Sequence, residues 1–211
     1  AAGGDEQFWT VGETFDSYDR IVEYVHRDGM LGLDGQFDFP LYYTIQAAFG
    51  SRTASLGELA ASAATSRDRY GDGLMSSFLG NHDVMRFSTQ AAEGWRAACD
   101  EASGDTSQAY ATADQGVYLR MKLAWTYLFT QPDVPLIYYG DEFGLPGYTD
   151  PDNRQPLWWH TGALPAGATV DDVIARLDTE PGNMLRHVRA LGQARLAHPA
   201  LWRGDTVEWW V

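Results

Sequence analysis

Three short clusters of polar residues follow apolar, strand-like segments, a position where α/β enzymes commonly carry their catalytic groups. The first is Glu13, which comes directly after the apolar run 7–12. A carboxylate at the end of a buried strand is partly desolvated, and desolvation makes it a usable general acid. The alternative for Glu13 taken alone is a solvated loop glutamate or a helix N-terminal one.

The second cluster, Asn81, His82 and Asp83, follows the strand-like segment 74–79. An amide, an imidazole and a carboxylate together can hydrogen-bond neighbouring hydroxyls of a sugar ring and hold the ring distorted. The structural alternative is a turn that caps the next helix, because Asn and Asp often have that role. The pattern leaves both interpretations open.

The third cluster closes the last clear strand, where segment 138–142 has the sequence YYGDE. Asp150 and Arg154 follow it, four residues apart on a loop rich in glycine, proline and tryptophan. Their charges could form a structural ion pair or could reach sugar hydroxyls together. In the same loop, Trp158 and Trp159 could stack on a sugar ring, but we favour loop packing for them.

Strand-like and helical patterns alternate along the chain, which favours an α/β fold with a parallel sheet covered by helices. Segment 145–167 lacks a period and is expected as a long loop, whereas the weakly periodic segment 94–112 is expected as a long excursion or a loose short helix. A four-stranded parallel sheet leaves unpaired edges and an uncovered face, so we expect the chain to be part of something larger or to be completed by a partner. The expected strands are 7–12, 36–39, 74–79, 135–140 and a start at 206–211, and the expected helices are 18–27, 41–49, 56–63, 114–130 and 183–197.

Composition limits the partners of the chain. Its net charge of −14 argues against nucleic acid and anionic membranes, and no apolar stretch is long enough to span a bilayer. Aromatic residues make up 13% of the chain, a content that mildly favours a carbohydrate ligand.

Cys99 is the only cysteine, so no disulfide forms within the chain. The compartment stays open, with a secreted or periplasmic location favoured, and the start at Ala1 without a leader favours a processed or truncated N-terminus.

These clusters, taken in order, resemble the α-amylase family, glycoside hydrolase family 13. The spacing is similar to that of the fifth, seventh and eighth strands of the family's barrel. The segments that carry the resemblance are Gly12 with Glu13, FLGNHD (78–83) with Arg86, PLIYYGDE (135–142) and DPDNR (150–154).

The resemblance implies a fold and a set of domains. Residues 1–204 are expected to form a partial catalytic domain, the C-terminal half of a TIM (β/α)8 barrel with strands 5–8. Residues 205–211 are expected to begin a C-terminal β-domain. Arg86 is expected to steady the strand end from behind the site.

The resemblance also implies roles for individual residues. Glu13 matches the family's general acid/base, and Asp83 matches the carboxylate that stabilises the transition state by binding ring hydroxyls. His82 matches a neighbour that binds the sugar. Asp150 and Arg154 match a pair that contacts the glycone side of the substrate.

The family's nucleophile, an aspartate in a Gly-x-Arg-x-Asp pattern after the fourth strand, has no match in this chain. A retaining glycosidase needs two carboxyl groups about 5–5.5 Å apart. We therefore expect the nucleophile and the N-terminal half of the barrel to come from an upstream segment. The family's usual calcium ligands are absent too; no metal or cofactor site is expected here, although the full-length protein could bind calcium.

The implied function is that of a retaining glycoside hydrolase, or transglycosylase, acting on α-glucosidic bonds of starch-like glucans or maltooligosaccharides. One alternative is a non-catalytic amylase-like protein that serves as a scaffold or binds carbohydrate, and the residue at the nucleophile position would separate the two. Another is a free-standing half barrel that dimerises over its open face, which sedimentation would reveal.

Overall fold

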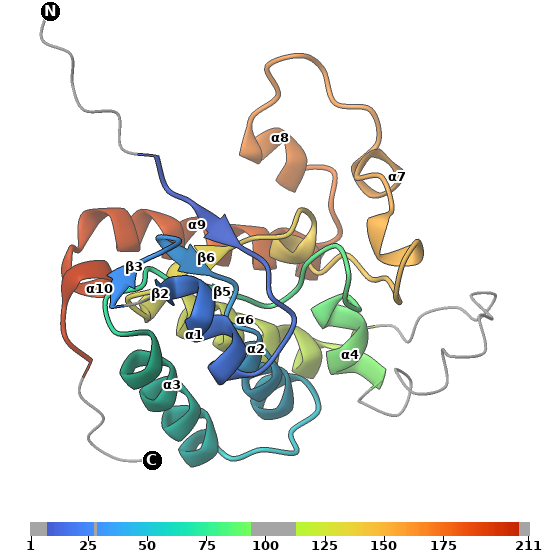
Figure 1. Ribbon diagram of the computed structural model, residues 1–211. Helices are drawn as coiled ribbons and strands as arrows, with labels where there is room; N and C mark the ends of the chain where they lie inside the picture. Colours follow the sequence, from blue (N-terminus) through green and yellow to red (C-terminus); the bar gives the residue numbers. More distant parts are fainter. Residues whose placement is uncertain (1–7, 28, 94–112, 207–211) are drawn as a thin grey trace, which may run out of the picture.

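The computed structural model describes residues 8–27, 29–93 and 113–206, which form a mixed α/β chain (Figure 1). A π-helical segment, η1 (Gln46–Gly50), extends α2, and two 3₁₀ turns, η3 (Asp141–Phe143) and η4 (Asp152–Arg154), follow β6. The strands are β1 (Val11–Gly12), β2 (His26–Arg27), β3 (Met30–Leu31), β4 (Gly35–Gln36), β5 (Ser76–Phe78) and β6 (Val134–Leu136). The α-helices are α1 (Tyr18–Val25), α2 (Phe39–Ile45), α3 (Leu56–Tyr70), α4 (Phe87–Glu93), α6 (Gln115–Thr130), α7 (Trp158–Thr161), α8 (Val170–Ile174), α9 (Thr179–Ala197) and α10 (Ala200–Arg203).

Four strands run parallel in the order β1, β4, β5, β6. Val11 of β1 pairs with Gly35 of β4, and Ser76 of β5 pairs with Val134 of β6. A single parallel bridge from Phe37 to Ser76 joins the two pairs. The expected parallel pairing is thus confirmed for these four strands. Because parallel strands point the same way, the loops after β1, β5 and β6 leave the sheet at one edge.

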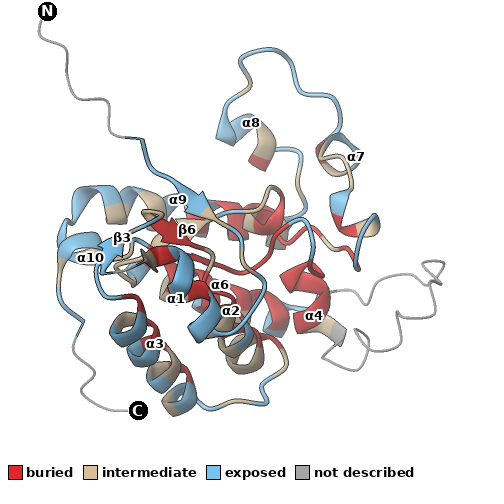
Figure 2. Ribbon diagram, in the orientation of Figure 1, coloured by how far each residue is buried: buried red, intermediate tan, exposed pale blue. Residues whose placement is uncertain are grey.

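The main core lies around α6 and α9, and Figure 2 shows the buried segments gathered there. Met121, Trp125 and Leu128 of α6 are buried together with Met184 and Val188 of α9. These residues recur at three- or four-residue intervals, so each helix presents one apolar face to this core. None of the described helices is both long and apolar enough to cross a lipid bilayer.

Some expected boundaries are wrong where tertiary contacts decide the structure. The helix expected over 18–27 ends at Val25, because β2 pairs antiparallel with β3 to form a hairpin. The expected loop 145–167 contains η4 and α7, and the helices α4 and α8 were not expected. The expectations for 94–112 and 207–211 concern residues outside the described part of the chain.

A buried carboxylate lies at the start of α2. Asp38 has no exposed surface, and its Oδ1 accepts hydrogen bonds from the backbone N–H of Leu41 (3.0 Å) and the hydroxyl of Tyr70 (3.4 Å). Burial raises the pKa of Asp38 from 3.8 to about 6, although these hydrogen bonds favour the carboxylate. The folded state therefore binds the proton more tightly than the unfolded chain. The contribution of Asp38 to stability falls as the pH rises from 3.8 to about 6.

Asp38→Asn is expected to raise the free energy of unfolding at pH 8 by on the order of 1–3 kcal/mol and to change it little at pH 4. Asparagine keeps the hydrogen bond that caps α2, but it removes a carboxylate that is ionised and desolvated at high pH. Equilibrium unfolding at the two pH values measures the difference. A stabilisation of equal size at both pH values would contradict the explanation by desolvation.

Candidate active site

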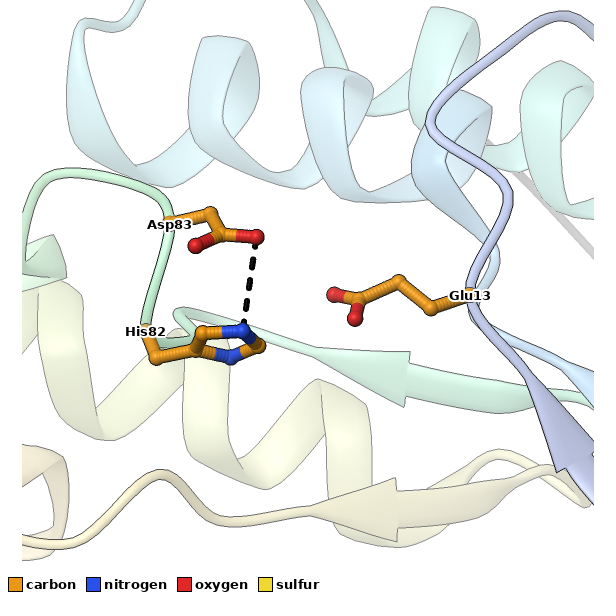
Figure 3. Close-up of side chains that lie close together, drawn as sticks. All are labelled: Glu13, His82 and Asp83. Atoms are coloured by element: carbon orange, nitrogen blue, oxygen red, sulfur yellow. Dashed lines mark ion pairs between the residues drawn. The ribbon is translucent and has the colours of Figure 1, made fainter.

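Glu13, His82 and Asp83 meet at the edge of the sheet where β1 and β5 end. Each offers one side-chain N or O atom, and these atoms all lie within 4.8 Å of one another. In Figure 3, Glu13 extends from the loop after β1 toward the other two side chains, which come from the loop after β5. His82 Nε2 lies 3.4 Å from Asp83 Oδ2. The strand ends thus bring together residues that are about 70 positions apart in sequence.

Asn81 links the two carboxylates. It is buried, its Nδ2 donates to Glu13 Oε1 (3.1 Å), and its Oδ1 accepts from the backbone N–H of Asp83 (2.9 Å). The second bond is a local Asx turn, and α4 begins only at Phe87. The alternative that this cluster caps the next helix is therefore not supported. Asn81 instead orients Glu13 toward Asp83.

The three charged or titratable groups of the cluster are more open than expected. Glu13 is exposed, and the His82 and Asp83 side chains are 47% and 52% exposed. The described residues therefore do not desolvate Glu13. The physical reason is that β1 pairs with one described strand only, β4, so its other edge is unpaired.

Arg154 ties the loop after β6 to this cluster. Its Nη2 lies 3.2 Å from Asp83 Oδ1, and its Nε lies 3.0 Å from Asp150 Oδ1. The Nε also donates to the backbone carbonyl of His82 (3.1 Å). The sequence left two interpretations for Asp150 and Arg154, a structural ion pair or a joint contact with sugar hydroxyls. The ion pair is present, and Arg154 also contacts Asp83, so the pair lies beside the other site residues. All five predicted site residues are therefore brought together.

A buried arginine supports the site from below. Arg86 has no exposed surface; its Nη1 pairs with Asp141 Oδ1 (2.9 Å) and donates to the Tyr139 carbonyl (2.6 Å). Its Nε donates to the carbonyl of Asn153 (2.8 Å), and its guanidinium carbon lies 4.1 Å from the Tyr138 ring centroid. The position agrees with the expectation that Arg86 steadies the strand end, because it joins the loop after β5 to the loop after β6.

A buried acid, Asp141, and a partly buried one, Glu142, follow β6 beside Arg86. Burial raises the pKa of Asp141 to about 7, although the Arg86 guanidinium beside it favours the carboxylate. Burial also raises the pKa of Glu142, against hydrogen bonds from backbone N–H groups. The sequence alone indicates no role for Asp141 or Asn153. The signal for Asp141 was weak, since an acid after a strand end is equally typical of a solvated turn.

Among the described residues, Glu13, His82 and Asp83 form the one group of three or more potential metal donors. The sequence indicated no ligand cluster, whereas Glu13, His82 and Asp83 bring three donors together. Calcium prefers six to eight oxygen ligands, and two carboxylates with an imidazole do not match that set. Exposed acidic groups at such spacing are also common without an ion, so the arrangement does not by itself define a metal centre.

The tryptophan pair of α7 does not pack into the loop as expected. Trp158 and Trp159 are 61% and 60% exposed, and their rings meet edge to face with centroids 5.8 Å apart. Helix α7 lies apart from the main body, at the upper right of Figure 1. A short helix at this position has few described neighbours to cover two indole rings.

Comparisons with known proteins find similarity to amylases and related enzymes. No family model matches the chain. It is 28% identical over 186 residues to a beta/alpha-amylase of Paenibacillus polymyxa, covering 85% of this chain and 12% of that protein. It is 27% identical to a cyclomaltodextrin glucanotransferase of Paenibacillus macerans, covering 99% and 24%. The fold matches an α-amylase of Geobacillus thermoleovorans, solved with acarbose, with a TM-score of 0.66 and 30% identity over 95% of this chain and 36% of that one.

These relatives are amylases and a glucan transferase. The chain is homologous to the α-amylase family, glycoside hydrolase family 13, over part of the length of its members. It spans 12% and 24% of the two curated relatives and 36% of the solved one. The resemblance expected from the motifs is confirmed.

Proposed function

We propose that this chain is the C-terminal half, strands 5–8, of the catalytic barrel of a retaining glycoside hydrolase or transglycosylase. The bonds it acts on are α-glucosidic bonds of starch-like glucans or maltooligosaccharides. The observation that carries the proposal is the convergence of Glu13, His82 and Asp83 within 4.8 Å at the ends of parallel strands. An N-terminal half of the barrel completes the sheet and supplies the nucleophile.

Glu13 is the general acid/base in this proposal. It protonates the glycosidic oxygen as the bond breaks and then activates the water or sugar hydroxyl that releases the product. The hydrogen bond from Asn81 Nδ2 to Glu13 Oε1 (3.1 Å) supports the role, because it fixes one carboxyl oxygen and leaves the other available for proton transfer. The missing half of the barrel also provides the cover that desolvates Glu13.

Asp83 and His82 bind hydroxyls of the sugar at the cleavage point. A carboxylate oxygen accepts hydrogen bonds from hydroxyl groups, and such bonds strengthen as positive charge develops on the ring. Asp150 and Arg154 contact the glycone side of the substrate, and Arg154 holds Asp83 through an ion pair of 3.2 Å. The relative solved with acarbose supports an oligosaccharide of α-linked units as ligand.

The test is hydrolysis of maltoheptaose by the protein with its N-terminal barrel half, followed by proton NMR of the first products. A retaining mechanism releases the α-anomer first, and mutarotation then produces the β-anomer. Initial release of the β-anomer would contradict the proposed mechanism. Maltoheptaose binding without any turnover would instead identify the non-catalytic, carbohydrate-binding alternative, and transfer products longer than the substrate would indicate transglycosylation.

A further inference from the structure

Asn153 holds the backbone on both sides of Asp83. Its side chain is fully buried in η4, and its Nδ2 donates to the carbonyl oxygens of His82 (2.8 Å) and Val84 (2.9 Å). These two carbonyls belong to the residues directly before and after Asp83. Both hydrogens of the amide nitrogen are therefore used to fix one short stretch of loop.

The orientation of this amide follows from its partners. Two carbonyl oxygens can only accept hydrogen bonds, so the NH₂ end of Asn153 must face them, and the reverse orientation would place three oxygens together. The backbone of Asn153 is held in turn, since its own carbonyl accepts from Arg86 Nε (2.8 Å). A buried chain of contacts thus runs from Arg86 through Asn153 to the loop that carries Asp83.

The side chain of Asp83 has few constraints of its own. It is 52% exposed, and its two side-chain neighbours, His82 and Arg154, are 47% and 43% exposed. Exposed ion pairs of long side chains fix geometry weakly. The position of the carboxylate must therefore come mainly from its backbone, which Asn153 holds from the buried side.

We infer that Asn153 is a positioning residue that sets the place of the Asp83 carboxylate through the two flanking carbonyls. The inference rests on the proposed function, in which Asp83 stabilises the transition state. A displacement of about 1 Å in such a group can reduce the rate about 10²-fold. The loss falls mainly on kcat, because the hydroxyl contacts of Asp83 strengthen in the transition state.

The experiment measures kcat and KM of Asn153→Ala and Asn153→Asp on maltoheptaose, in the protein with its complete barrel, from pH 4.5 to pH 8. Asn153→Ala is expected to lose about 10²-fold in kcat at every pH. Asn153→Asp places a carboxylate against two carbonyl oxygens at high pH, but once protonated it can donate one hydrogen bond again. Its kcat relative to wild type is therefore expected to rise at least about tenfold between pH 8 and pH 4.5.

Ser88→Ala is the matched control. Ser88 is buried in α4 and donates from its hydroxyl to the Leu145 carbonyl (2.7 Å), so it joins the segment after β5 to the loop after β6 without a hydrogen bond to the residues beside Asp83. It is expected to lower the thermal unfolding temperature while kcat stays within about twofold. Circular dichroism confirms that each variant is folded; if Asn153→Ala is not, the isosteric Asn153→Asp carries the test alone.

Two results would overturn this inference and leave the proposed function intact. The inference is overturned if wild type turns over maltoheptaose and the ratio of the Asn153→Asp kcat to the wild-type kcat does not change between pH 4.5 and pH 8. A kcat loss in Ser88→Ala equal to that of the Asn153 variants would also overturn it, since general loosening of the loops would then explain both. Absence of turnover in wild type would overturn the proposed function itself.

Discussion

Replacing Glu13 with glutamine is expected to lower kcat/KM on maltodextrins by about 10³-fold. Glutamine has nearly the same shape, and its Oε1 can still accept the hydrogen bond that Asn81 Nδ2 donates to Glu13 (3.1 Å). The amide cannot give a proton to the glycosidic oxygen, so the leaving group departs as an alkoxide. Initial rates of reducing-sugar release from maltoheptaose measure the loss.

Glu23→Gln is the control for this change. Glu23 is an exposed glutamate of α1 that pairs with Arg20, one turn earlier on the same helix. Its replacement removes the same charge from a surface with no site residue, and activity is expected to stay at the wild-type level. Near-wild-type turnover by Glu13→Gln would remove Glu13 from the role of general acid.

Asp83→Asn is expected to lower kcat by about 10²–10³-fold, with a smaller effect on KM. The amide keeps the size of the side chain but loses the negative charge that favours the developing positive charge of the sugar ring. It also loses the ion pair with Arg154 (3.2 Å) and the contact with His82 (3.4 Å). Steady-state kinetics on maltoheptaose separate the kcat effect from the KM effect.

A second surface acid serves as the comparison for Asp83. Asp171 pairs with Arg189 at 2.8 Å, and its side chain is 76% exposed. Asp171→Asn breaks an ion pair of the same kind outside the site and is expected to leave kcat unchanged. If Asp83→Asn raised KM strongly while kcat stayed constant, Asp83 would bind the substrate without stabilising its transition state.

Long periodic elements of this fold could be predicted from the sequence. The helix expected over 114–130 is found at Gln115–Thr130, because its apolar residues recur at helical spacing and Asp114 accepts from the Val117 N–H at its start. The hairpin of β2 and β3 could not be predicted, since each strand has two residues and only their pairing defines them. Helix α8 had a local signal that was missed, the capping box of Thr169 and Asp172.

The site was predictable where strand order alone determines proximity. Glu13, His82 and Asp83 each follow a strand, and parallel strands place such residues at one edge. The role of Asn153 could not be predicted, because its partners His82 and Val84 are distant in sequence and neither bond has a local pattern. The exposure of Glu13 was also missed, since burial depends on the neighbours of β1 and not on its own apolar residues.

The role of Glu13 as general acid is tested by comparing two substrates of the Glu13→Gln variant in the protein with its complete barrel. Maltoheptaose needs a proton on its leaving oxygen, whereas fluoride leaves α-maltosyl fluoride without one. In the proposed mechanism the variant loses about 10³-fold on maltoheptaose but keeps most of the rate of the first fluoride release, measured as a burst, because only the later release of the product needs Glu13 as a base. A first fluoride release slowed as much as the hydrolysis of maltoheptaose would contradict the assignment of Glu13 as the general acid.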